Sequence, residues 1–321
     1  MSKTDKQPAN EKLKKQILKL KGVDFRGPEE LAEFLKKEDV RFSAHDLMAF
    51  GLILATRFGR SAGTSYVPEW LAEVFSSLVE GVSPKIICDP WAGIGLLIGI
   101  LREASMAKTV IAFTPNNGEL SLGQVIVPEA DWQVGDPLQL IDAIPSELDV
   151  VASILPMGAR TNHPLKLILP SGDAVELADD LGNLILVAAS MRLSPSGIGL
   201  FVVTPSFFFS VRSVFRRFSE LGLGIEAALA LPSGTFAPYT NIPSYLVVIR
   251  RKPSTRMFVA QLSADTNTNL QVISNFRQGA EGGSLELGRF VAADTFRSIE
   301  HLRATETMTA AERRLGVQAS N

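Results

Sequence analysis

The sequence has very few of the residues that build metal centres and disulfide frameworks. Its 321 residues include one cysteine, Cys88, and three widely separated histidines, His45, His163 and His301. A single thiol excludes a disulfide framework and any zinc site made of clustered cysteines. Three histidines so far apart are a poor basis for a histidine-built centre. We therefore expect no bound metal.

Long apolar runs are also missing. The longest, residues 86–101 and 200–211, are interrupted by Asp89 and by Thr204-Pro205. Both fall short of the roughly 20 apolar residues that a membrane helix needs. Residues 1–22 carry seven lysines but no apolar core of the kind found in secretory signals. We expect a soluble, cytoplasmic protein with no membrane partner.

An excess of basic charge is absent as well. Lys and Arg number 32 against 34 Asp and Glu, a net charge of −2, whereas a protein that holds DNA by charge alone is strongly basic. The charge is unevenly distributed, because residues 85–200 carry six bases and thirteen acids, and residues 201–256 carry seven bases and two acids. This split would permit an anionic partner to bind on one side of the protein.

The composition that remains is that of a globular protein, with 46% hydrophobic and 21% charged residues. Residues 1–65 read as an N-terminal helical segment. Pro28 begins a stretch with apolar residues at helical spacing. Ser43-Ala44-His45-Asp46 has the form of a capping box and precedes a helix predicted over residues 47–58. A further helix is predicted to begin near Pro68.

From Lys85 onward, short apolar strands alternate with helices. The strands are predicted at Lys85–Cys88, Thr109–Phe113, Asp149–Ile154, Gly199–Thr204, Ile225–Leu231 and Ser244–Arg250, and the helices at 95–104, 179–192 and 211–221. This alternation predicts an α/β domain over residues 66–252 with a doubly wound, mostly parallel sheet. Residues 253–321 form a C-terminal extension with a strand at Met257–Leu262, a polar connection and a charged helix near 305–315.

The first predicted strand ends in Asp89-Pro90-Trp91-Ala92-Gly93-Ile94-Gly95, and an apolar helix follows at once. Ligands bind at the carboxyl ends of the strands in open α/β sheets. Glycines in such a loop let the backbone turn sharply and approach a ligand closely. A tight turn without a ligand is the alternative interpretation.

Four further segments surround this loop in chain order. They are Tyr66-Val67-Pro68, Gly135-Asp136-Pro137-Leu138, Ile154-Leu155-Pro156-Met157 and the run Leu231-Pro232-Ser233-Gly234-Thr235-Phe236-Ala237-Pro238-Tyr239-Thr240. Together, over residues 45–252, they resemble the N-6 adenine DNA methylase family, and specifically the modification subunits of type I restriction systems. The run that begins at Leu231 is the most specific part of this resemblance.

The resemblance implies a Rossmann-like fold that binds S-adenosylmethionine and acts on double-stranded DNA, together with a specificity, nuclease or other partner subunit. It also implies roles for individual residues. Tyr66, Val67 and Pro68 would help to hold the cofactor, the loop residues Asp89, Pro90, Gly93 and Gly95 would surround its methionine moiety, and Asp136 with Leu138 would reach its adenine amino group.

Two departures from the family pattern coincide with the chemistry. Family members have Asn-Pro-Pro-Phe/Tyr where this chain has Ile154, Leu155, Pro156 and Met157. The asparagine oxygen accepts a hydrogen bond from the target amine, and Ile154 has no such acceptor. The second predicted strand also ends at Thr114 without the acidic residue that holds ribose hydroxyls in nucleotide-binding folds. Glu119 is the nearest acidic substitute.

These observations favour a methylase-fold protein that acts in DNA modification, restriction or defence and is weakly active or inactive. An active adenine N6-methyltransferase is the first alternative, and it would require a substitute acceptor, either the Ser153 hydroxyl or a backbone carbonyl. A non-catalytic subunit that binds a partner through its terminal segments is the second alternative. A nicotinamide dehydrogenase is disfavoured because the three-glycine motif is absent.

Overall fold

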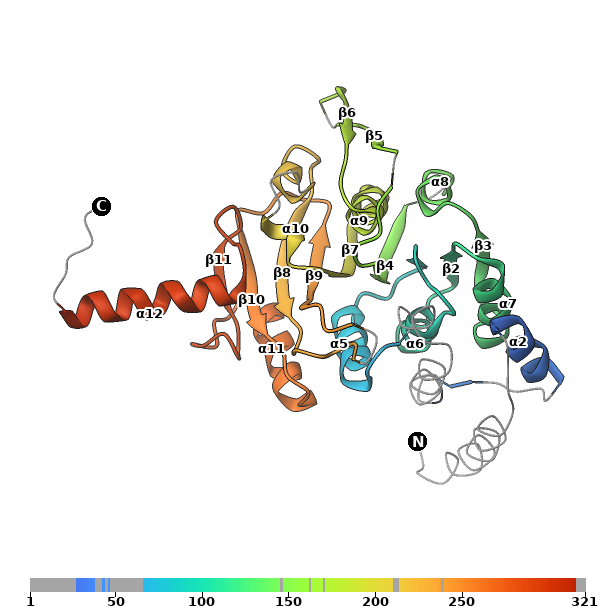
Figure 1. Ribbon diagram of the computed structural model, residues 1–321, viewed down its shortest axis with the longest axis horizontal. Helices are drawn as coiled ribbons and strands as arrows, with labels where there is room; N and C mark the ends of the chain where they lie inside the picture. Colours follow the sequence, from blue (N-terminus) through green and yellow to red (C-terminus); the bar gives the residue numbers. More distant parts are fainter. Residues whose placement is uncertain are drawn as a thin grey trace. The chain divides into compact units, whose positions relative to one another are not determined.

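The computed structural model describes residues 27–37, 42–43, 46, 66–144, 147–161, 163–169, 171–209, 214–237 and 240–315 (Figure 1). It divides into two compact units. The first contains Met1–Pro156 and Thr235–Asn241, and the second contains Met157–Gly234 and Ile242–Asn321. His45 and the helix predicted over 47–58 lie outside the described residues. The ranges 1–65, 66–252 and 253–321 remain a proposal for the domain organisation.

Four parallel strands form the sheet of the first unit. Their order is β4 (Leu148–Ile154), β1 (Ile86–Asp89), β2 (Thr109–Thr114) and β3 (Asp131–Val134). The connections contain α6 (Leu96–Ser105), α7 (Asn117–Ile126) and α8 (Pro137–Asp142). The three strands predicted in this unit are confirmed to within one residue at each end. Their apolar side chains are buried, as expected for parallel strands covered on both faces.

Two helices precede this sheet. The predicted helix at Pro28 is confirmed as α2 (Pro28–Lys37), which buries Leu31, Ala32 and Leu35 and packs against α7. The helix predicted near Pro68 is α5 (Glu69–Val79). The capping box is also confirmed, because the Asp46 amide donates to Ser43 Oγ at 3.2 Å and the Ser43 amide donates to Asp46 Oδ2 at 3.0 Å.

The second unit contains a mixed sheet. Its strand order is β11 (Arg289–Ala292), β10 (Arg256–Gln261), β8 (Gly224–Ala230), β9 (Tyr245–Arg250) and β7 (Leu193–Val203). β10 and β8 are parallel, and the other neighbouring pairs are antiparallel. The buried helix α9 (Leu181–Met191) precedes β7. Across the chain the fold is therefore α/β with a mostly parallel sheet, as the sequence predicts.

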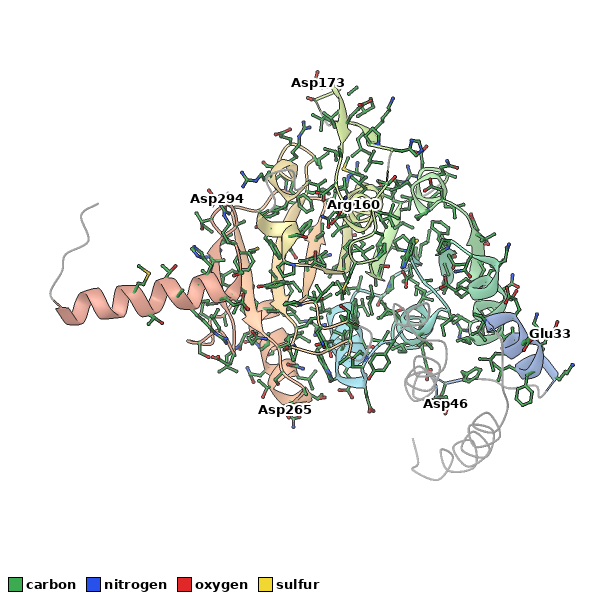
Figure 2. The ribbon with its side chains drawn as sticks, in the orientation of Figure 1. Glu33, Asp46, Arg160, Asp173, Asp265 and Asp294 are labelled. Atoms are coloured by element: carbon green, nitrogen blue, oxygen red, sulfur yellow. The ribbon has the colours of Figure 1, made fainter. Side chains whose placement is uncertain are left out.

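Several elements of the second unit differ from the sequence predictions. The polar connection after β10 contains α11 (Thr266–Gln278), which Asp265 caps by accepting the Thr268 amide at 2.8 Å. Asparagine usually favours loops, but in α11 Asn269 is buried and its side-chain oxygen accepts a hydrogen bond from the Ser263 amide at 3.0 Å. A two-stranded hairpin, β5 (Leu165–Ile168) with β6 (Ala174–Leu177), was also unpredicted. Figure 2 labels Asp173 at its turn.

The helix predicted over 211–221 is a further difference. Its described part contains only the short 3-10 helix η1 (Val214–Arg217). Phe215 and Phe218 both pack against Phe207 of α10 (Ser206–Phe209), with ring centroids 5.7 and 5.6 Å from it. This aromatic packing fixes the backbone in a tighter turn than the α-helical pattern predicts.

The charged helix at the C-terminus begins earlier than predicted and is α12 (Ile299–Leu315). Figure 1 shows it extending outward beyond β11. Its first residue is anchored, because the Ile299 amide donates to the Tyr245 hydroxyl at 3.1 Å. None of the helices in the described part of the chain is long and apolar enough to cross a membrane. Within the same residues, no three His, Cys, Asp or Glu side chains are grouped to hold a metal ion.

Candidate functional site

The glycine loop connects β1 directly to α6. Gly93 and Gly95 have φ angles of 54° and 88°, in the left-handed region that favours glycine. A Cβ atom at Gly95 would lie 2.7 Å from Cζ2 of Trp132, which contributes its indole ring from β3. The loop is also tied to β2, because the Ala92 amide donates to the Phe113 carbonyl at 2.8 Å. Gly95 is therefore required by both its backbone conformation and its packing.

The Asp89 carboxyl group lies at the base of this loop with only 2% of the residue exposed. Its Oδ1 atom accepts hydrogen bonds from Ser153 Oγ at 2.6 Å and from the Trp91 amide at 3.0 Å. Burial raises the pKa of Asp89 to about 7, although both hydrogen bonds act in the opposite direction. Asp89 thus connects the end of β1 to the end of β4 and to the turn that follows it.

The end of β2 carries a hydroxyl and a carboxylate in place of a strand-end acid. Thr114 Oγ1 donates to Glu119 Oε2 at 2.5 Å, and both residues are buried. Glu119 belongs to the first turn of α7. Its amide donates to the Asn116 side chain at 2.8 Å, so Asn116 caps the helix and fixes the direction of that turn.

The segment after β3 lies beside this pair. The Gly135 amide donates to the Thr114 carbonyl at 3.1 Å. The next residue, Asp136, is exposed and caps α8 by accepting the Leu138 amide at 2.9 Å. Three predicted site segments, the glycine loop, the end of β2 and Asp136, are thereby brought to one edge of the sheet of the first unit.

The segment at residues 66–68 enters helix α5. Val67 and Pro68 are buried and Tyr66 is half-buried. The Pro68 carbonyl accepts the amides of Leu71 and Ala72 at 3.0 and 2.9 Å. In the structure these residues therefore start the helix, and their predicted contact with a cofactor remains a prediction.

The end of β4 presents an apolar surface where the family pattern has an amide. Ile154, Leu155 and Pro156 are buried, with Ile154 5% exposed. Ser153 is completely buried, and its hydroxyl is engaged with Asp89. Met157, the first residue of the second unit, is half-buried, with its Sδ 3.9 Å from Ser244 Oγ. The hydroxyl considered as a substitute acceptor for the amine donates its proton to Asp89, and its complete burial keeps its lone pairs away from a target base.

Several residues of the basic stretch are bonded within the second unit. Arg217 forms an ion pair with Glu220 at 2.8 Å, and Arg250 forms one with Glu226 at 3.1 Å. Arg251 donates to the Leu193 carbonyl at 3.2 Å. Much of the positive charge between residues 201 and 256 is consequently used in internal contacts.

Two features of the site escaped the sequence analysis. The first is the Asp89–Ser153 hydrogen bond, which follows from the parallel pairing of β1 and β4. The second is Trp132, whose ring also occupies the space over Gly123, where a Cβ would lie 2.3 Å from its Cη2. Gly123 lies inside α7, which the sequence analysis did not predict; a glycine within a helix is the signal that could have indicated a close-packed aromatic partner.

Solved structures share this arrangement of helices and strands. A type I restriction-modification methyltransferase subunit from Streptococcus thermophilus has a TM-score of 0.57 and 12% identity over 76% of this chain and 57% of its own. A chain from a type I R-M system complex has a TM-score of 0.60 and 17% identity over 85% of this chain and 69% of its own. The chain has the fold of the type I modification subunits.

This fold extends to other methyltransferases. A Listeria monocytogenes protein named as a class I S-adenosylmethionine-dependent methyltransferase has a TM-score of 0.57 and 17% identity, and covers 73% of this chain and 79% of its own. The sequence matches no protein-family model and no curated protein. The present chain spans a little over half the length of the Streptococcus subunit. At identities of 12% and 17%, the similarity to these solved structures concerns the fold alone.

Proposed function

We propose that this protein is an N6-adenine DNA methyltransferase-like module of a modification, restriction or defence system, with weak or absent catalytic activity. The type I modification-subunit fold supports the first half of the proposal. The second half rests on one observation, the buried apolar side chain of Ile154 where the amine acceptor is needed. A specificity, nuclease or other subunit would supply most of the affinity for double-stranded DNA.

The residues around the glycine loop suit S-adenosylmethionine, which supplies a transferable methyl group when it is bound. Gly93 and Gly95 give the loop the open backbone that a ligand can approach. The exposed carboxylate of Asp136 would accept from the adenine amino group, while Asp89 braces the loop from within. These contacts would hold and orient the cofactor, while the side chain at position 154 offers the target base no acceptor.

The exocyclic amine of adenine is a weak nucleophile because its lone pair is delocalised into the ring. An acceptor for its N–H groups makes the nitrogen more nucleophilic, and the loss of one such polar group lowers the rate about 100- to 1000-fold. The Ile154 side chain offers no acceptor, and the Ser153 hydroxyl is completely buried and bonded to Asp89. The structure thus supports the weak or inactive form of the proposal over the fully active alternative.

Restoration of the motif tests this proposal. The triple variant Ile154→Asn, Leu155→Pro, Met157→Phe should methylate adenine in DNA at least about 100-fold faster than the wild-type chain in a tritiated-methyl transfer assay, with partner subunits from the same operon present. The matched control is Ile154→Leu, Leu155→Pro, Met157→Phe, which restores the proline and the aromatic ring without the amide.

The control should remain at the wild-type rate, because the amide is the missing acceptor. Wild-type turnover equal to that of the restored variant would refute the degenerate-site proposal. If neither protein binds S-adenosylmethionine in calorimetry, the cofactor part of the proposal is wrong.

A further inference from the structure

Two exposed arginines of the second unit, Arg160 and Arg216, are left without a role by the proposed function. Arg160 follows Met157 by three residues, and Arg216 lies in the 3-10 helix η1. Among the described residues, neither guanidinium group forms an ion pair or a hydrogen bond. An exposed arginine of this kind keeps its charge and its N–H donors available for an anion.

The start of α9 attaches the two segments that carry these arginines. Arg160 forms an isolated antiparallel bridge with Asp180, the residue that precedes α9. The neighbouring Asp179 accepts the amide of Val214, the first residue of η1, at 2.8 Å through its Oδ2 atom. Figure 2 labels Arg160 close to α9. Two consecutive residues therefore hold both arginine-bearing segments in place.

The two aspartates at this position differ in the negative charge that they leave available. The Asp179 carboxylate accepts three N–H groups, from the Asp180 amide at 2.7 Å, the Asn183 side chain at 2.8 Å and the Val214 amide at 2.8 Å. These donors offset much of its charge within the fold. The Asp180 side chain makes no capping hydrogen bond and is half-buried. Asp180 is therefore the acid that opposes an anion beside Arg160.

The next residue along η1 provides an internal contrast. Arg217 forms an ion pair with Glu220 at 2.8 Å, so its charge is used within the second unit. Arg216, in the same short turn, has no such partner in the described part of the chain. Guanidinium groups bind phosphates well, because their N–H donors match two oxygens of one phosphate. Two of them attached to one helix start suit a ligand with several phosphates along its length.

We propose that Arg160 and Arg216 contact the phosphate backbone of double-stranded DNA, with Asp179 and Asp180 as the residues that hold their segments. This inference rests on the proposed function, in which DNA is the partner. Phosphate contacts fix the position of a duplex and carry no sequence information directly. The two arginines would thus add affinity for DNA of any sequence, while a partner subunit selects the site.

The experiment measures how DNA affinity depends on salt. The full chain, assembled with partner subunits from the same operon, is titrated by fluorescence anisotropy against two duplexes of unrelated sequence, from about 50 to about 200 mM salt. Arg160→Gln and Arg216→Gln should each lower the slope of log affinity against log salt by about 0.9. At about 0.1 M salt this corresponds to an affinity about 8-fold lower for both duplexes. The matched control is Arg217→Gln, which should keep the wild-type slope because its charge is already paired.

The slopes separate this inference from the proposed function. Wild-type slopes in both variants would overturn the inference while leaving DNA as the partner. An equal loss in Arg217→Gln would also overturn it, because net charge alone would then explain the effect. A loss confined to one duplex would indicate a base contact instead of a backbone contact. If the wild-type complex binds neither duplex, the DNA part of the proposed function is wrong and the inference fails with it.

Two further variants test charge separately from folding. Arg160→Lys keeps the positive charge and should restore a slope close to that of the wild-type chain, whereas a slope like that of Arg160→Gln would contradict a charge contact. Asp180→Asn removes the opposing acid, and asparagine is an equally good residue before a helix. It should raise the affinity about 2- to 5-fold. An unchanged affinity would contradict a phosphate beside Arg160.

Discussion

Replacement of the buried Asp89 by asparagine should remove a pH dependence from the stability of the first unit. The ordinary pKa of an aspartate, 3.8, is raised to about 7 in the folded chain, chiefly because burial disfavours the charged form. Between these two values the folded state binds more protons than the unfolded state. The contribution of Asp89 is therefore fully present below its ordinary pKa and is lost as the pH rises through the folded pKa.

The magnitude follows from the two pKa values. From pH 5 to pH 8 the wild-type chain loses about two pKa units of this contribution, which is roughly 2.6 kcal/mol. The new side chain in Asp89→Asn would not titrate, and its oxygen can accept the same bonds from Ser153 and the Trp91 amide. The variant should therefore gain about 2.6 kcal/mol relative to the wild-type chain over this range.

Urea denaturation at pH 5 and pH 8 measures this difference. All three tryptophans, Trp70, Trp91 and Trp132, lie in the first unit, so their fluorescence reports its unfolding. The other titrating groups are common to both proteins and cancel in the comparison. Stability curves that stay parallel within about 0.5 kcal/mol from pH 5 to pH 8 would refute the reasoning, because Asp89 would then be ionised at no cost.

Three other substitutions test particular contacts. Ser153→Ala removes a hydrogen bond that lowers the pKa of Asp89, so the pH at which the Asp89 contribution to stability is lost should move above 7. An unchanged pH of this loss would contradict the prediction. Gly95→Ala should destabilise the first unit by about 1–3 kcal/mol in urea denaturation, because the new Cβ would clash with the indole ring of Trp132. The loss should be smaller when Gly95→Ala is made in a Trp132→Phe background, and strictly additive effects of the two substitutions would exclude the clash. Tyr245→Phe should cost about 1 kcal/mol and speed hydrogen exchange at the start of α12; unchanged exchange would rule out this anchor.

The strands were predictable because burial on both faces leaves a simple pattern. The runs at 85–88, 109–113 and 149–154 are mostly apolar, and each strand is confirmed to within one residue at each end. Parallel strands must be covered by helices on both sides, so such runs leave little room for another interpretation. The glycine loop at the end of the first of these strands followed from the same reasoning, and the other site segments followed from the resemblance to the methylase family.

The missed elements depend on contacts distant in the sequence. α11 is polar, and its buried Asn269 is stabilised by the Ser263 amide instead of by an apolar face. The 3-10 turn at Val214–Arg217 is set by aromatic packing against Phe207, which no local pattern contains. Local propensity gives way to tertiary packing at such positions.

The candidate site likewise contains residues that leave a signal in the sequence and contacts that depend on the tertiary structure. Gly95 was identified because a glycine loop after a strand leaves a local signal, whereas Asp136 was identified from the resemblance to the methylase family; its capping of α8 is seen in the structure. The Asp89–Ser153 bond joins two strands whose adjacency is a property of the sheet. It could be inferred only after the strand order was known.

The departures from the family pattern have different structural consequences. At the end of β2 a missing strand-end acid is accompanied by Glu119, a carboxylate delivered to the same place from the next helix. At the end of β4 the missing amide is replaced by a buried Ile154, and the neighbouring Ser153 hydroxyl is completely buried and donates to Asp89. The end of β2 therefore keeps a buried acidic acceptor, whereas at the end of β4 an apolar side chain stands where the family pattern has an acceptor.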